Sequence, residues 1–242
     1  MLQFLEWDSN FFQLGAARLD ASKLAPDEMV VELQSLKDSD YQLIYIFSPH
    51  GVESINKEII GSGGKLVDQK VTFSMNISGF IPQYSPKIRS CLGFEMDKDL
   101  EMLAIESGKY SRFKVDEQIP RNKFEDLYRL WMKNSLLGVF AKEVFVFEDD
   151  GKKTGMVSVD IRGGEGWIGI IAVDEKSRGK QIGKHLMHAA IQYFMEQNVG
   201  ILNVQTQLDN SVSCAFYEKI GFRIRNIEDV YHFWNKEGVS KS

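Results

Sequence analysis

The sequence predicts an α/β (α+β) protein, and three observations lead to this class. Short apolar, β-branched stretches such as 201–206 are typical of strands, and they alternate with longer stretches whose apolar residues recur at helical spacing. The chain has 242 residues, which suggests one full domain plus a smaller one. A hydrophobic fraction of 43% supplies a sizeable core.

The first part of the chain predicts a small α/β domain over residues 1–85. Helices are expected over 26–37, where the first turn is acidic, and over 52–60. Strands are expected over 43–47 and 66–77. The segment 79–86 holds two of the five prolines and predicts a linker.

The second part, residues 90–242, predicts the larger domain. Strands are expected at 91–96, 144–147 and 154–161, the last two joined by the turn Asp149-Asp150-Gly151. Helices are expected at 100–106 and 121–137. The rest of the pattern predicts a strand ending at 173, a helix from 182, a strand at 201–206, a helix through 213–220 that Gly221 ends, and a strand from 222.

Composition and charge exclude several functions. The net charge of −5 argues against nucleic-acid binding, which needs an excess of Lys and Arg. No apolar run is long enough to span a bilayer, and the first residues do not resemble a signal peptide, so we expect a cytoplasmic protein without a membrane partner. Cys91 and Cys214 have no metal or redox spacing, and His185 and His188 lack a nearby ligand partner, so we expect free thiols and no metal.

The most informative stretch is an apolar strand, 169–173, that runs through a basic turn into the helix from 182. A helix N-terminus offers unpaired N–H groups and about half a positive charge. Gly179 and Gly183 let the backbone approach a ligand closely. The cations of this stretch are Arg178, Lys180 and Lys184. The pattern predicts a pyrophosphate site; the alternative is an ordinary strand-to-helix connection with a solvated basic turn.

This turn belongs to a longer motif. Residues 178–183 read Arg-Gly-Lys-Gln-Ile-Gly, Asn210 follows, and residues 216–222 read Phe-Tyr-Glu-Lys-Ile-Gly-Phe. In order and spacing the motif resembles the acetyl-coenzyme A site of the GNAT superfamily of N-acetyltransferases. The resemblance implies a GNAT acyltransferase fold with a mixed central sheet. It departs from the family at Gln181, where a glycine is usual.

The resemblance also implies roles for individual residues. Acetyl-coenzyme A, as co-substrate, would meet the main chain of a strand that splays from its neighbour, at Ile171, Ala172 and Val173. Its pyrophosphate would meet the turn residues Arg178, Gly179, Lys180, Gln181, Ile182, Gly183 and Lys184. Asn210 would hydrogen-bond the cofactor arm, and the hydroxyl of Tyr217 would protonate the sulfur. From the residues alone, a simple helix cap at Asn210 and a core tyrosine at 217 stay open.

Short segments from one end of the chain to the other carry a second resemblance. They are Trp-Asp-Ser-Asn-Phe-Phe at 7–12, Ser-Arg-Phe at 111–113, and the aromatic-rich stretches 124–131 and 230–234. These segments are similar to those of dTDP-4-amino-4,6-dideoxygalactose (dTDP-fucosamine) N-acetyltransferases. The resemblance implies a nucleotide-linked amino-sugar acceptor, a role in cell-surface polysaccharide biosynthesis, and acceptor binding by Asp8, Ser9 and Arg112. The alternatives are a helix cap at Asp8 or Ser9 and core packing of the aromatics.

The sequence therefore predicts an acetyl-coenzyme A-dependent N-acetyltransferase in which a small-molecule amine attacks the thioester directly. The N-terminal domain is expected to contribute to the acceptor site. A proton acceptor for the amine is not singled out, although a water chain ending on Asp8 would serve. One rival is a GNAT enzyme for another amine, such as an amino acid, a polyamine or a protein N-terminus. Another is a non-catalytic acyl-coenzyme A-binding module. The oligomeric state, a homodimer included, stays open.

Overall fold

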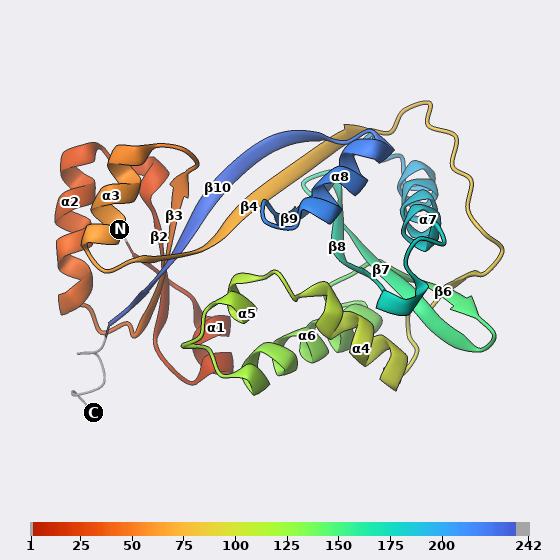
Figure 1. The fold of residues 1–242 in the computed structure, drawn as a ribbon, viewed down its shortest axis with the longest axis horizontal. Helices are drawn as coiled ribbons and strands as arrows, with labels where there is room; N and C mark the ends of the chain where they lie inside the picture. Colours follow the sequence, from red (N-terminus) through yellow and green to blue (C-terminus); the bar gives the residue numbers. More distant parts are fainter. Residues whose placement is uncertain (1, 236–242) are drawn as a thin grey trace. The chain divides into compact units, whose positions relative to one another are not determined.

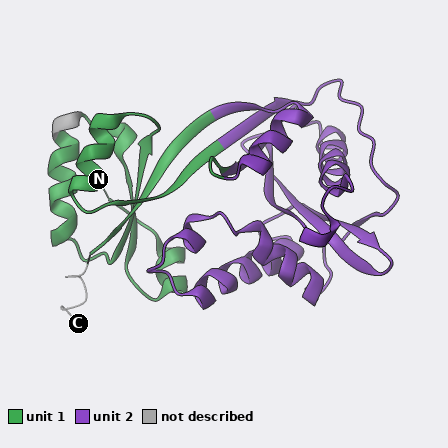
Figure 2. Ribbon diagram, in the orientation of Figure 1, with its two compact units in different colours: residues 1–71, 207–209, 226–242 green, residues 72–206, 210–225 purple. Residues whose placement is uncertain are grey.

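The computed structural model describes residues 2–235, with residues 26 and 27 in backbone alone; the last residues of the predicted 90–242 domain lie outside this range. The chain divides into two compact units (Figure 2). The first unit contains residues 1–71, 207–209 and 226–242, and the second contains 72–206 and 210–225. This division differs from the boundary predicted near 85–90, because strand β4 (Lys65–Asn76) runs from one unit into the other and because the chain later returns to the first unit.

The first unit is a small α/β body (Figure 1). Its strands lie in the order β1-β2-β3-β10-β4, with β2 parallel to β3 and β10 antiparallel to β3. Its elements are β1 (Gln3–Phe4), α1 (Glu6–Phe12), β2 (Ala16–Asp20), α2 (Pro26–Ser35), β3 (Leu43–Pro49), α3 (Glu53–Gly61), and parts of β4 and β10 (Arg223–Trp234). Short 3₁₀ turns follow β2, at Ala21–Lys23, and α2, at Leu36–Asp38.

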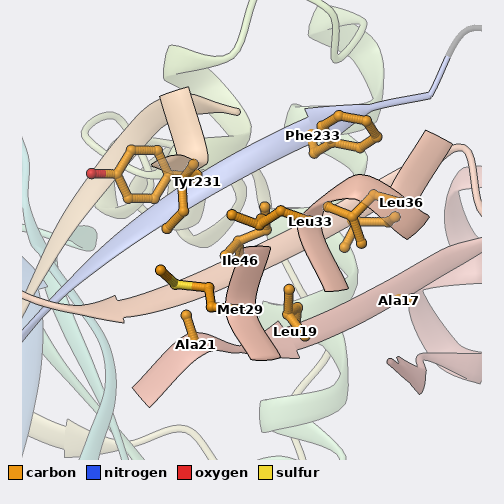
Figure 3. Packing of buried hydrophobic residues seen from close by; sticks show 11 residues of the cluster. Ala17, Leu19, Ala21, Met29, Leu33, Leu36, Ile46, Tyr231 and Phe233 are labelled. Atoms are coloured by element: carbon orange, nitrogen blue, oxygen red, sulfur yellow. The ribbon is translucent and has the colours of Figure 1, made fainter. Parts of the chain in front are cut away.

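The core of the first unit lies between one face of this sheet and the helices α2 and α3. Figure 3 shows Leu19 and Ile46 of the sheet packed with Met29 and Leu33 of α2. Strand β3 is apolar and aromatic, and six of its seven residues are buried, which explains why the sequence signal for it is a continuous apolar run. Tyr231 and Phe233 of β10 complete the same core.

The second unit holds the rest of the mixed sheet, in the order β4-β9-β8-β7-β6-β5, with β8 and β9 parallel and β5 to β8 antiparallel. Its strands are β5 (Ile88–Ser90), β6 (Glu143–Asp149), β7 (Lys152–Arg162), β8 (Glu165–Val173) and β9 (Ile201–Gln207). Its helices are α4 (Lys98–Ser107), α5 (Arg112–Val115), α6 (Arg121–Leu136), α7 (Ile182–Glu196) and α8 (Ser211–Ile220). The predicted α/β class with a mixed sheet is confirmed.

The hairpin turn predicted at 149–151 is confirmed, and two helices begin with side-chain caps. The turn between β6 and β7 places Asp150 and Gly151 at positive φ, as a two-residue hairpin turn requires. Asp97 caps α4 by accepting from the Leu100 N–H at 2.9 Å, and Asn210 caps α8 by accepting from the Ser213 N–H at 3.2 Å. None of the described helices combines the length and the apolar character that crossing a membrane requires.

Two local predictions are wrong. The strand predicted at 91–96 is β5, three residues earlier, because the chain leaves the sheet after Cys91: Gly93 turns with a φ of 82°, and its N–H donates to the Leu136 carbonyl at 2.7 Å. The alternative of a helix cap at Asp8 or Ser9 is wrong as well, because both residues lie inside α1, whose N-cap is Leu5. Helix α1 and strand β2 were not predicted.

Candidate functional site

A cavity of about 910 Å³ lies within the second unit. Four segments line it: the end of α4, the end of β8, the turn before α7 with its first residues, and α8. Every predicted cofactor residue except Lys180 lines this cavity. The turn before α7 and helix α8, both parts of the motif, line one cavity, and the end of α4, which lies outside the motif, lines it as well.

The end of β8 is open on one edge. Strand β8 pairs with β7 up to Val173, but its paired register with β9 covers only Gly166, Trp167 and Ile168 among the described residues. Ile171, Ala172 and Val173 therefore have no paired register with β9 among the described residues. These three residues line the cavity. Such an edge offers N–H and C=O groups to an extended ligand.

A bulge in β8 positions this edge. The register with β7 shifts between Val157 and Val159, and the Ile170 N–H donates to the Ser158 hydroxyl at 3.0 Å. A Cβ at Gly169 would lie 2.6 Å from that hydroxyl, so a larger residue there would force the hydroxyl or the strand to shift. Sequence reasoning did not identify Ser158 or Gly169, because neither carries a local signal for a bulge.

The turn before α7 has a conformation adapted to a ligand. Gly179 has a φ of 80° and Gln181 a φ of 60°, so the glutamine occupies the left-handed region that favours glycine. The first intrahelical bond runs from the His185 N–H to the Gln181 carbonyl, which leaves the N–H groups of the first turn available. Gly183 lies against α8, since a Cβ there would approach the Phe216 ring to 3.3 Å.

The charge of the cavity lining is positive. The cations are Lys109, Arg178, Lys184 and Lys219, while Glu106 supplies the only carboxylate among the described lining residues. Glu106 pairs with Arg178 and, at 3.2 Å, with Lys109. This excess of positive charge suits an anionic ligand. Glu106, Lys109 and Phe216 were not predicted as site residues, because tertiary packing alone brings them here.

Tyr217 is buried and lines the cavity. Its ring packs against those of Phe73, Phe216 and Phe222, at centroid distances of 5.7, 5.3 and 5.9 Å. Burial, with a smaller contribution from Cys214, raises the pKa of Tyr217 well above its usual range. The hydroxyl therefore stays protonated at neutral pH.

His188 also lines the cavity, whereas the sequence analysis considered it only for a metal site and expected none. Its Nδ1 accepts a hydrogen bond from the Gln83 N–H at 2.9 Å, which requires a neutral ring with its proton on Nε2. Burial, followed by the Lys184 charge, lowers the pKa of His188 below its ordinary value. Among residues 2–235, no cluster of three or more His, Cys, Asp or Glu side chains has the arrangement of a metal site.

The residues predicted for the acceptor fall in different units. Asp8 and Ser9 lie on α1 of the first unit, and Arg112 begins α5 of the second. Asp8 accepts from the Tyr45 hydroxyl at 3.2 Å. The Ser9 hydroxyl donates to the Leu5 carbonyl at 2.7 Å and accepts from the Ala16 N–H at 2.9 Å. The Arg112 guanidinium lies 4.4 Å from the Phe113 ring centroid. That these residues meet stays a prediction.

Known proteins resemble this chain in sequence. Residues 105–222 match the Acetyltransferase (GNAT) family. The spore coat polysaccharide biosynthesis protein SpsD of Bacillus subtilis is 28% identical over 132 residues, which cover 54% of this chain and 45% of SpsD. The uncharacterized N-acetyltransferase MJ1530 of Methanocaldococcus jannaschii is 25% identical over 127 residues, which cover 51% of this chain and 81% of that protein. The match thus spans less than half of the length of SpsD.

A solved structure resembles the fold. The GCN5-related N-acetyltransferase from Sphaerobacter thermophilus superposes with a TM-score of 0.55 at 15% identity, over 79% of this chain and 59% of that one. At this identity the likeness concerns the fold alone, and it agrees with the mixed sheet described above.

Proposed function

Because residues 105–222 match the Acetyltransferase (GNAT) family, we propose that this protein transfers an acetyl group from acetyl-coenzyme A to the amine of a nucleotide-linked 4-amino-4,6-dideoxy sugar. The observation that carries the proposal is the cavity of the second unit. It combines an open β8 edge, an open helix N-terminus and a protonated tyrosine.

The lining of the cavity fits acetyl-coenzyme A. The main chain from Arg178 to Lys184 would hold the pyrophosphate, because helix N–H groups and a positive dipole end bind phosphate oxygens. The open edge at Ile171–Val173 would pair with the amide groups of the pantetheine arm. Asn210 would bind that arm as well, although its side-chain oxygen already caps α8.

Acetyl transfer needs a group that stabilises the oxyanion, a proton donor and a proton acceptor. The bound thioester supplies the acetyl group, whose carbonyl oxygen gains negative charge as the amine attacks; a main-chain N–H of the β8 edge would stabilise that charge. Tyr217 would donate its proton to the sulfur as the carbon–sulfur bond breaks. The attacking amine must lose a proton, and Asp8 is our candidate for the carboxylate at the end of a water chain.

The acceptor rests on sequence resemblance and on one relative. The segments at 7–12 and 111–113 are similar to those of dTDP-fucosamine N-acetyltransferases, and SpsD is named for spore coat polysaccharide biosynthesis. Asp8 and Arg112 would then bind the acceptor, with the planar guanidinium of Arg112 suited to a diphosphate. The Ser9 hydroxyl is engaged with main chain, which favours a positioning role for it.

A free-thiol assay tests the proposal. Purified protein and acetyl-coenzyme A would be mixed with dTDP-4-amino-4,6-dideoxygalactose, with the free amino sugar, and with an amino acid, spermidine and a peptide. We expect thiol release with the nucleotide sugar at a rate far above that with the other amines. The control is Gly183→Asp, which adds bulk and negative charge beside Phe216 and should abolish coenzyme A binding in calorimetry.

The other outcomes identify the rivals. Equal release with simple amines would keep the acetyltransferase and reject the nucleotide sugar. Coenzyme A binding without thiol release on any amine would favour a non-catalytic acyl-coenzyme A-binding module.

A further inference from the structure

Helices α7 and α8 both line the cavity of the second unit and contact each other there (Figure 1). Gly183 of α7 lies against the Phe216 ring of α8, since a Cβ at Gly183 would come within 3.3 Å of that ring. Lys184 follows Gly183 directly, and Lys219 lies one turn after Phe216. Both lysines line the cavity and therefore stand within one helical turn of the contact between the two helices.

The positive charge of these two lysines is not compensated by the protein. Of the four cations that line the cavity, Arg178 and Lys109 both pair with Glu106. Within the part of the chain that the structure describes, neither Lys184 nor Lys219 forms an ion pair with a carboxylate. The uncompensated charge of the lining thus comes from α7 and α8.

His188 adds a fixed neutral donor to the same lining. Its side chain lies one turn after Lys184 on α7, so the two share a helix face. The ring is only 8% exposed, and the Phe80 ring packs edge-on against it at 5.1 Å between centroids. Because Nδ1 accepts from the Gln83 N–H, the proton is on Nε2. No described residue accepts from that Nε2–H, and Nε2 is not among the buried atoms that lack a partner, so it opens into the cavity.

This set of groups fits a phosphomonoester. A neutral Nε2–H and two ammonium groups are all donors, so their ligand must supply acceptors and negative charge. A phosphomonoester carries a charge of about −1.5 to −2 at neutral pH and has three terminal oxygens. Coenzyme A has one such group, on the 3′ oxygen of its ribose, in addition to its pyrophosphate. An adenine ring has no charge and would leave both lysines uncompensated.

We propose that His188, together with Lys184 and Lys219, binds the 3′-phosphate of coenzyme A, and that this contact lets the protein discriminate between coenzyme A and dephospho-coenzyme A. The inference rests on the coenzyme A part of the proposed function and is independent of the acceptor. It assigns His188 a role in cofactor selection that neither the motif nor the pyrophosphate turn requires.

Calorimetry with coenzyme A and with dephospho-coenzyme A, in the absence of an acceptor, tests the subsite. We expect the parent to bind coenzyme A about a hundredfold more tightly, the scale of charge-assisted hydrogen bonds to one phosphate. Lys219→Gln should reduce this ratio about fivefold, as the loss of one exposed charge pair does. The matched control is Lys133→Gln, which should keep the parent's ratio. Lys133 is likewise an exposed lysine in the last turn of a helix, α6, but it does not line the cavity.

Two variants isolate the His188 imidazole. His188→Phe keeps a ring and removes the Nε2–H, so the affinity ratio should fall about tenfold. His188→Gln supplies a neutral amide N–H and should retain part of the ratio. In proton–nitrogen NMR spectra of the histidine rings, the signal that is absent from His188→Gln identifies His188. Its Nε2–H should move downfield with coenzyme A and much less with dephospho-coenzyme A, a difference that a purely structural histidine would not show.

The outcomes separate this inference from the proposed function. An affinity ratio equal to the parent's in Lys219→Gln and His188→Phe would overturn the subsite, and so would an equal loss of affinity for both ligands. If His188→Phe unfolds because the Gln83 N–H loses its acceptor, the NMR signal of the parent and the ratio in Lys219→Gln still decide. Discrimination that depends on His188 and Lys219, without acetylation of the nucleotide sugar, would keep the subsite and reject that acceptor. Acetylation of the nucleotide sugar by a protein that binds both cofactors equally would do the reverse.

Discussion

Gln181 has a left-handed backbone conformation, which is unfavourable for a residue other than glycine. It stands before α7 with a φ of 60° and a ψ of 13°, in a region that costs a residue other than glycine about 1 kcal/mol. The sequence identified the departure from the family's glycine but could not tell whether the turn would adapt to the glutamine. The turn keeps its left-handed shape, so the glutamine bears the strain.

Replacing Gln181 by glycine should therefore stabilise the protein. Relief of the left-handed strain exceeds the entropy cost of a glycine, so we expect a gain of about 0.5–1 kcal/mol in the free energy of unfolding by urea. Gln181→Ala keeps the strain and should show no gain. A destabilised glycine variant would mean that the glutamine side chain makes a compensating contact.

Tyr217 offers a test of catalysis. Tyr217→Phe removes the hydroxyl and keeps the ring packing, so turnover should fall on the order of a hundredfold with coenzyme A affinity nearly unchanged. Because the pKa of Tyr217 is raised, the donor stays protonated as pH rises, and the parent should show no loss of turnover from this group below pH 10. Steady-state rates from pH 6 to 10 measure both effects; parent-like turnover in the variant would show that another group protonates the thiolate.

His188 should make stability depend on pH. Its pKa is lowered in the folded protein, so below its ordinary value of 6.5 the unfolded chain binds a proton that the folded chain does not. The contribution of His188 to the free energy of unfolding is therefore fully present above about pH 6.5 and is lost as the pH falls below that value. Urea unfolding at pH 7.5 and 5.5 should show this decrease for the parent and a smaller one for His188→Gln.

At the scale of elements, strand β8 shows how packing makes a site that local patterns do not reveal. The hairpin turn at Asp150-Gly151 and the cap at Asn210 could be predicted because the residues that act are neighbours in the chain. The bulge at Gly169 depends on Ser158 of the neighbouring strand β7, and no local pattern encodes that contact. Glu106 and His188 reach the cavity from helices α4 and α7 in the same way.

Filling the bulge should disturb the β8 edge that we propose binds the cofactor. Gly169→Ala would place a Cβ 2.6 Å from the Ser158 hydroxyl, so β8 must shift or the hydroxyl must leave the Ile170 N–H. We expect a loss of about 1–3 kcal/mol in stability and weaker coenzyme A binding in calorimetry. Ser158→Gly combined with Gly169→Ala should cost less than the sum of the single changes. Strictly additive effects would show that the two residues are not coupled.

At the scale of the whole molecule, each unit is built from segments that are separated in the sequence. Residues 228–234 of β10 pair with β3 across seven residue pairs, from Glu228 to Trp234, and β10 lies between β3 and β4. The sequence pattern predicted a small domain over 1–85 because its helices and strands carry clear local signals. The partner for β3 lies about 180 residues away, and such a long-range pairing leaves no local periodicity.

A truncation after Arg225 should therefore unfold the first unit. It removes Tyr231 and Phe233 from the core and leaves β3 without one of its partners. Hydrogen exchange followed by mass spectrometry should show loss of protection over residues 16–71, while β7 and β8 keep theirs. Full protection of β3 in the truncated protein would contradict this expectation.

The position of β10 at residues 223–234, long after β3 in the sequence, has a consequence for biosynthesis. At about 5–20 residues per second, the ribosome needs roughly 8 to 30 s to proceed from residue 71 to residue 226. Throughout that interval β2, β3 and α2 have emerged, but the strand that closes their sheet has not been made. An open strand edge beside an apolar helix surface is prone to pair with other chains. Binding by a holdase chaperone would therefore protect the nascent chain most during synthesis of residues 71–226. Synonymous codons that speed elongation between residues 71 and 226 should raise the soluble yield.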